Sequence, residues 1–200
     1  MTMKCLECGN AMTRSVGDHV YRESGMDHVI LRNITKLHCE TCGAKRVQIQ
    51  AIAQLHRALA NAIARKPARL VPSEVRFLRD HLELTNTEFA ALMGVSSHQT
   101  SRWTSSDPIG VPAERFLRLL ATLGPELVKP AVSDESEEDR PKITAETVGI
   151  ARAGFAQEAI EGVAQVIHHL PPPSAEAKTV KIGLRRASGG SWKQDSATAN

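Results

Sequence analysis

Four cysteines form the strongest chemical pattern in this chain of 200 residues. They fall into two Cys-x-x-Cys pairs, each followed by a glycine, and 30 residues separate the pairs. A Cys-x-x-Cys turn directs two thiolates toward one point, and the glycine lets the backbone turn tightly around a metal. The pattern therefore predicts a structural Zn²⁺ site with four sulfur ligands, which are Cys5, Cys8, Cys39 and Cys42.

A redox dithiol is the alternative use of such cysteines, but it requires a βαβ pattern that this sequence lacks. The N-terminus shows no signal-peptide pattern, and no apolar run is long enough to span a membrane. We therefore expect a cytoplasmic protein, away from membranes, whose thiols stay reduced and bind metal. Four thiolate ligands leave no position for water, and the chain has no nucleophile–base pair at usable spacing, so we expect no enzyme activity.

A second group of polar residues lies on the expected outer face of a short helix that begins after Ser96. Thr100 and Trp103 are expected to face inward, which turns the residues around them outward. A recognition helix presents such residues to base edges and phosphates in the major groove of DNA. The candidate DNA-contacting residues are Ser97, His98, Gln99, Ser101 and Arg102.

Arg102 is the best candidate among these, because a guanidinium can bind guanine O6 and N7 with two hydrogen bonds. His98 or Gln99 could read bases near the start of the helix, although Gln99 could instead cap the helix at Ser96. An ordinary helical hairpin with a solvated polar face is the alternative. The capping residues, together with Gly94 and Val95, favour DNA binding.

Hydrophobic periodicity and the positions of capping residues, glycines and prolines predict the strands and helices that hold the cysteines and the candidate DNA-contacting residues. Short alternating runs over 19–23 and 28–32 predict a β-hairpin between the cysteine pairs, and a third strand is expected over 46–49. Apolar residues at helical spacing predict a helix over 51–65, and residues 66–69 are the candidate linker after it. Four further helix starts are marked by capping residues or proline, at Pro72, Thr85, Ser96 and Pro112.

The sequence thus predicts an α+β protein in three parts. Residues 1–66 form a small zinc-bound β-hairpin module with a helix, and residues 67–130 form an all-α helix-turn-helix domain. Residues 131–200 form a largely disordered or partly helical tail, with an acidic linker, a helix over 144–169 and a disordered end. The net charge of +3 divides as +5, 0 and −2 over the three parts. The middle part alone should therefore bind DNA weakly, unless it dimerises or the N-terminal part also contacts the DNA.

Two stretches resemble known families. The run from Leu82 to Trp103 resembles the XRE/Cro-type helix-turn-helix, and the start at Met3 with its cysteine pairs is similar to the YgiT-type zinc finger. In this order they resemble the MqsA-type antitoxins of bacterial type II toxin–antitoxin modules, over residues 3 to about 128. The resemblance implies a zinc domain that engages a toxin and a C-terminal domain that dimerises on a palindromic operator. It assigns the four cysteines as zinc ligands and Arg102 as the base-reading arginine, with His98 in place of a base-reading asparagine.

The function predicted from the sequence is a sequence-specific, DNA-binding transcriptional regulator. We expect a homodimer on a double-stranded operator, acting as an antitoxin that neutralises a toxin partner through its zinc domain and represses its own operon. Two alternatives stay open at this point. One is a stand-alone zinc-containing regulator, and the other is an interaction adaptor without a toxin, which the neutral charge of residues 67–130 favours.

Overall fold

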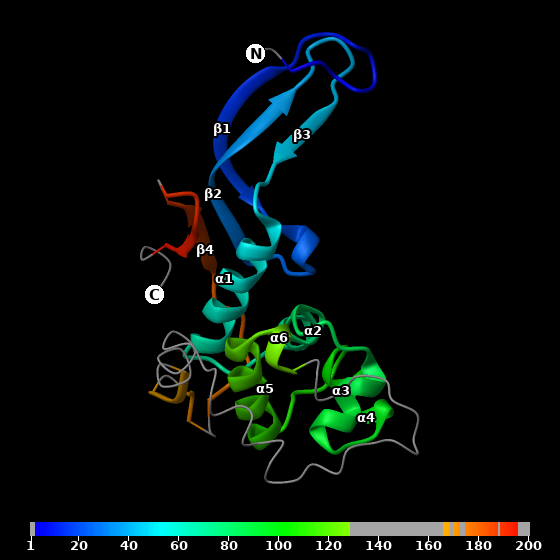
Figure 1. Ribbon diagram of the computed structural model, residues 1–200, viewed down its shortest axis with the longest axis vertical. Coiled ribbons are helices and arrows are strands. Elements are labelled where there is room, and N and C mark those ends of the chain that lie inside the picture. The colour runs from blue at the N-terminus through cyan, green and yellow to red at the C-terminus, as the bar shows by residue number, and fades with distance from the viewer. Residues whose placement is uncertain (1–2, 129–165, 169, 173–174, 188, 196–200) are drawn as a thin grey trace. The chain divides into compact units, whose positions relative to one another are not determined.

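The computed structural model describes residues 3–128, 166–168, 170–172, 175–187 and 189–195 (Figure 1). The chain divides into two compact units, residues 1–59 with 181–200 and residues 60–180. None of the helices in these described ranges is long and apolar enough to cross a membrane. The elements in chain order are β1 (Thr13–Val20), the 3-10 helix η1 (Arg22–Ser24), β2 (Val29–His38), β3 (Lys45–Gln48), α1 (Ile52–Arg65), α2 (Pro72–His81), α3 (Asn86–Met93), α4 (Ser97–Trp103), α5 (Val111–Leu123), α6 (Pro125–Val128), β4 (Ile182–Arg186) and β5 (Trp192–Gln194).

The first unit is built around β2. Along one edge, β2 pairs antiparallel with β1. The other edge is shared, because β3 pairs antiparallel with residues 35–38 and β4 pairs parallel with residues 29–32. Asn33, with a φ of 56°, lies between these two halves, and asparagine is one of the few residues that tolerate this left-handed conformation. β5 completes the sheet by pairing antiparallel with β4.

β4 and β5 correct the expectation of a disordered C-terminal end. Three of their side chains are buried, with exposed fractions of 1% for Ile182, 0% for Leu184 and 7% for Trp192. The Trp192 indole N–H also donates to the Gln50 carbonyl at 3.0 Å. Small and polar residues dominate this part of the sequence, but these three apolar side chains bury enough surface to dock it on β2. The expected acidic linker and the expected helix over 144–169 lie outside the described residues, apart from 166–168.

The other expected elements of the first unit are present with shifted ends. The hairpin strands are longer than predicted, and η1 replaces the end of the first predicted run. Tyr21, which precedes η1, is buried, and Gly25 ends the turn in the left-handed conformation with a φ of 76°. The predictions of β3 and α1 are confirmed to within one residue at each end.

The helices of the second unit begin where the capping residues predict. Pro72 is the first residue of α2, Thr85 and Ser96 cap α3 and α4, and Pro112 lies in the first turn of α5. These helices bury an apolar core, because their inward positions recur at helical spacing. Its fully buried members include Leu70, Val75, Leu78, Leu82, Phe89, Ile109 and Leu117.

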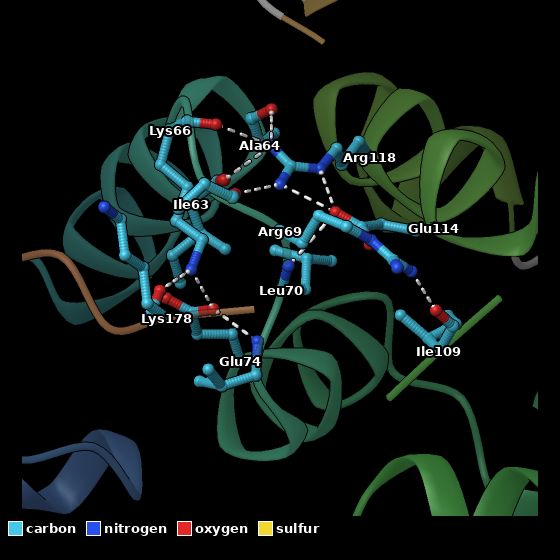
Figure 2. A network of polar contacts seen from close by, with 12 residues as sticks. Ile63, Ala64, Lys66, Arg69, Leu70, Glu74, Ile109, Glu114, Arg118 and Lys178 are labelled. Carbon is cyan, nitrogen blue, oxygen red and sulfur yellow. Dashed lines mark hydrogen bonds and ion pairs between the residues drawn. The ribbon is translucent and has the colours of Figure 1, made fainter. Parts of the chain in front are cut away.

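Residues 66–69, predicted as a linker, are instead held by a buried arginine (Figure 2). The Arg118 side chain, on α5, is fully buried. It donates to the carbonyls of Ala64 at 2.8 Å, Lys66 at 3.0 Å and Ala68 at 2.7 Å. These carbonyls lie at and just beyond the C-terminal end of α1, where a cation is favoured by the helix dipole. Arg118 therefore caps α1 from another helix, which the sequence pattern did not reveal.

Two carboxylates pair with the three cations of this network, which are Arg118, Arg69 and Lys66 (Figure 2). Glu114 accepts from Arg118 at 2.9 Å, from the Arg69 side chain at 2.9 Å and from the Leu70 N–H at 3.0 Å. Glu74 accepts from Lys66 at 2.6 Å. A buried charge is tolerated only when it is paired and hydrogen-bonded, and this network satisfies that condition. The segment between α1 and α2 is therefore a fixed part of the second unit.

Candidate metal centre and candidate nucleic-acid interface

The two cysteine turns have the same local structure. In the first, the Cys5 N–H donates to the Asn10 carbonyl at 2.8 Å and the Gly9 N–H donates to the Cys5 carbonyl at 2.9 Å. In the second, Cys39 and Gly43 make the equivalent bonds at 2.9 Å and 2.8 Å. Gly9 and Gly43 have φ angles of 76° and 75°, a conformation that disfavours other residues. The glycine after each pair thus closes the turn, as the sequence predicts.

The four sulfurs lie together, each within 4.8 Å of the others. The Cys5 and Cys42 sulfurs are 3.6 Å apart, and those of Cys8 and Cys39 are 3.4 Å apart. A tetrahedral zinc–thiolate site with bonds of about 2.3 Å has sulfurs about 3.8 Å apart. All four cysteines are free of disulfides, so the donor set and its spacing fit one metal ion.

Backbone N–H groups favour the thiolate form in this cluster. The Cys42 N–H is the largest cause that lowers the pKa of Cys39, to about 6, and the Cys8 N–H lowers the pKa of Cys5. The Ala44 N–H acts the same way on Cys42, but burial and the neighbouring sulfurs together raise its pKa to about 12. A cation among the four sulfurs would favour the thiolate form of all four, and a bound metal would supply that cation.

A small apolar cluster supports the four sulfurs. Met12 and Leu37 are buried against Cys5 and Cys39, and Ala44 packs on the same cluster. Cys8 and Cys42 are exposed on the other side. Half of the ligand set is therefore anchored in the core of the first unit, and the other half faces solvent.

The second candidate site is formed by α3 and α4. The Thr85 hydroxyl accepts from the Glu88 N–H at 3.2 Å, and the Glu88 carboxylate accepts from the Thr85 N–H at 2.6 Å, which completes the predicted capping box. Gly94, with a φ of 66°, ends α3, and the Ser96 hydroxyl accepts from the Gln99 N–H at 3.2 Å. Two short helices are thus joined by a three-residue turn, with each end satisfied.

One asparagine fixes α4 against α3. The Asn86 side chain donates to the Ser97 carbonyl at 2.9 Å and to the Ser101 hydroxyl at 3.1 Å, and it accepts from the Thr100 hydroxyl at 2.9 Å. Sequence reasoning did not single out Asn86, because its position as the first residue of α3 has no periodic signal. These three hydrogen bonds fix the orientation of α4 about its own axis. One of them occupies a lone pair of the hydroxyl oxygen of Ser101, which is a predicted DNA-contacting residue.

The structure places the five predicted DNA-contacting residues on the outward side of α4. Thr100 and Trp103 are buried, with exposed fractions of 0% and 6%, as expected. Four of the five predicted DNA-contacting residues are exposed, namely Ser97, His98, Ser101 and Arg102. The fifth, Gln99, is half-buried. They form one accessible face of a short helix, which is the arrangement that groove reading requires.

Arg102 has an acidic neighbour that the sequence analysis missed. Its guanidinium forms an ion pair with Asp107, and the exposed fraction of the arginine side chain is 52%. The Ser106 hydroxyl and then Arg102 lower the pKa of Asp107, so this carboxylate is charged at neutral pH. The Arg102 carbonyl also accepts the Asp107 N–H at 2.9 Å, which fixes the turn after α4. Any anion that binds Arg102 must therefore compete with Asp107.

Comparison with known proteins gave one positive result. Neither the curated proteins nor the solved structures matched this chain. A family model described as the antitoxin component of a bacterial toxin–antitoxin system, MqsA, matches residues 3–130. This range holds both cysteine pairs and all helices from α1 to α6. With more than half of its length matched, the chain belongs to the MqsA antitoxin family.

Proposed function

We propose that this protein is an antitoxin that binds duplex DNA through α4 and represses its own operon. The observation that carries the proposal is the outward face of α4, because its exposed residues combine hydrogen-bonding groups with one guanidinium. The family match supports the antitoxin role, and the face supports DNA binding. Direct contact with base edges gives sequence discrimination that phosphate contacts alone do not supply.

In this mechanism Arg102 reads a guanine with two hydrogen bonds, and His98 reads a base near the start of α4. Ser97 and Ser101 contact phosphates or base edges through their hydroxyls. Asp107 holds the Arg102 guanidinium in place in the free protein through their ion pair. On binding, Arg102 leaves Asp107 and contacts a base instead. A guanine compensates for the lost ion pair with two hydrogen bonds, whereas another base does not, and this difference favours the correct site.

We propose that the four cysteines hold a structural Zn²⁺. Four thiolates in a tetrahedral arrangement are the donor set of closed zinc sites, and the ion would favour the thiolate form of Cys42, whose pKa is raised by burial and by the neighbouring sulfurs. The same first unit is the proposed contact for the toxin. A homodimer is the proposed DNA-binding form, because a palindromic operator pairs one recognition helix with each half-site.

The test has two arms. In the first, a labelled duplex from the region upstream of the protein's own gene is titrated with wild type and with Arg102→Ala, and tight, sequence-dependent binding by the wild type alone supports the proposal. In the second, the product of the adjacent gene is expressed with and without this protein. Growth arrest that this protein relieves supports the antitoxin role, whereas specific DNA binding without relief identifies a stand-alone regulator.

A further inference from the structure

Positive charge is unevenly divided between the two compact units. The first unit holds twelve Lys and Arg residues against six Asp and Glu, whereas the second unit holds thirteen against sixteen. Most of the acidic surplus of the second unit lies in residues 129–165, outside the described residues. Residues 60–128, which hold the proposed base-reading helix α4, carry eight Lys and Arg against seven Asp and Glu and so offer little net positive charge. Because neutralisation of phosphates dominates the sequence-independent part of DNA affinity, the surplus cations of the first unit are the natural source of that affinity.

The C-terminal strands contribute strongly to this surplus. Residues 181–195 carry four Lys and Arg residues and one Asp. The register of the sheet places Arg32 of β2 beside Arg185 of β4, and Arg185 beside Lys193 of β5. Residues paired in this way point to the same face of a sheet, so three cations form a row across three strands. Like charges directly opposite one another destabilise a sheet.

The three cations of the row differ in their partners. Arg32 is balanced by Asp18 and by Asp195, the latter at 3.6 Å. Arg185 and Lys193 are exposed, and within the described part of the chain neither has an acidic partner. By contrast, the Arg186 side chain, on the opposite face, donates to the Gly190 carbonyl at 3.0 Å and to the Gln50 side chain. The face that carries Arg185 and Lys193 thus offers two cations to solvent at a cost in strand stability.

We propose that this face, formed by Arg185 and Lys193, is a second contact for the phosphates of duplex DNA. The proposal rests on the proposed DNA-binding function and adds a site outside residues 3–130, the range that the family model matches. Two exposed cations on neighbouring strands fit an extended polyanion, because successive phosphates of one duplex can contact both of them at once. Ile182, Leu184 and Trp192 anchor the strands from the opposite face, so the cations are held on a folded surface.

The experiment compares salt titrations of binding to a random-sequence duplex of about 20 base pairs, using the full-length, metal-loaded protein. Each phosphate contact contributes about 0.9 to the slope of log affinity against log salt. Arg185→Ala/Lys193→Ala should therefore lower the slope by about 2 per chain. Arg185→Lys/Lys193→Arg should keep the slope, because the charges remain. Arg22→Ala/Lys45→Ala removes the same charge from other exposed positions of the first unit and should leave the slope near that of wild type.

The outcomes separate this inference from the proposed function. If both double alanine variants lower the slope equally, only net charge matters and the inference is wrong. An unchanged slope in Arg185→Ala/Lys193→Ala, with specific operator binding lost in Arg102→Ala, also overturns it but leaves the proposed function standing. A wild type that binds no duplex at all contradicts both. Thermal melting and metal content of each variant establish that the sheet is intact.

Discussion

Replacing Arg118 with methionine tests whether the buried network holds the second unit together. Arg118 is fully buried, ion-paired to Glu114 at 2.9 Å, and bonded to three carbonyls at or below 3.0 Å. Methionine fills much of the same volume but donates no hydrogen bond. The substitution therefore leaves the carbonyls at the end of α1 unsatisfied and Glu114 with one cation fewer.

The expected loss of stability can be worked from these contacts. Removing one member of a buried ion pair costs about 3–5 kcal/mol, and each buried carbonyl left without a donor costs about 1–3 kcal/mol. Glu114 keeps its bonds to Arg69 and to the Leu70 N–H, which limits the electrostatic part. We expect a loss of about 4 kcal/mol, which lowers the urea midpoint by about 2 M at an m-value of about 2 kcal/mol/M.

Tryptophan fluorescence is the assay. The chain has two tryptophans, and Trp103 alone lies in the second unit. In a Trp192→Phe background, urea unfolding followed at Trp103 reports that unit. Arg115→Met, an exposed neighbour on α5, is the matched control and should change stability by less than about 0.5 kcal/mol. A loss under about 1 kcal/mol for Arg118→Met would refute the reasoning; if that variant does not fold, Arg118→Lys should show an intermediate loss.

Three further predictions concern the metal, the C-terminal strands and α4. Elemental analysis should find one zinc ion per wild-type chain. Cys39→Ser should abolish this stoichiometric binding and unfold the first unit, because structural zinc contributes folding free energy. Full metal content in the variant would contradict this prediction. Deleting residues 175–200 should expose Val29 and Leu31, which are fully buried in the intact chain. The melting temperature of the first unit should therefore fall by several degrees. An unchanged melting temperature would show that β4 and β5 do not stabilise the first unit. Asp107→Asn should raise the affinity for all duplexes by less than about tenfold, because the carboxylate that competes for Arg102 is lost. Fluorescence anisotropy titrations measure this affinity. Weaker binding by the variant would contradict the role given to this ion pair.

The sequence predicts those elements whose cause is local. Thr85 and Glu88 mark the start of α3, Gly94 marks its end, and Ser96 marks the start of α4, because each acts through the backbone within four residues. The cysteine turns follow the same logic, since the glycine after each pair sets the geometry. Thr100 and Trp103 face inward as helical periodicity requires.

The missed features all depend on residues far apart in the chain. β4 pairs with β2 across about 150 residues, and parallel pairing of so distant a segment leaves no turn signal in the sequence. Arg118 reaches the end of α1 from more than 50 residues away, so residues 66–69 resemble a linker until the fold supplies their donor. Asp107 lies in the turn after α4, where composition alone does not show that it neutralises Arg102.

Selection of bound sequences from a random duplex library tests the central claim most directly. The metal-loaded full-length protein is used, with Arg102→Ala selected in parallel. The wild type should enrich a palindrome with two half-sites, one for each α4 of a dimer, and the variant should lose the guanine that Arg102 reads in each half-site. No enrichment by the wild type, or the same enriched sequence from both proteins, would contradict base reading by α4.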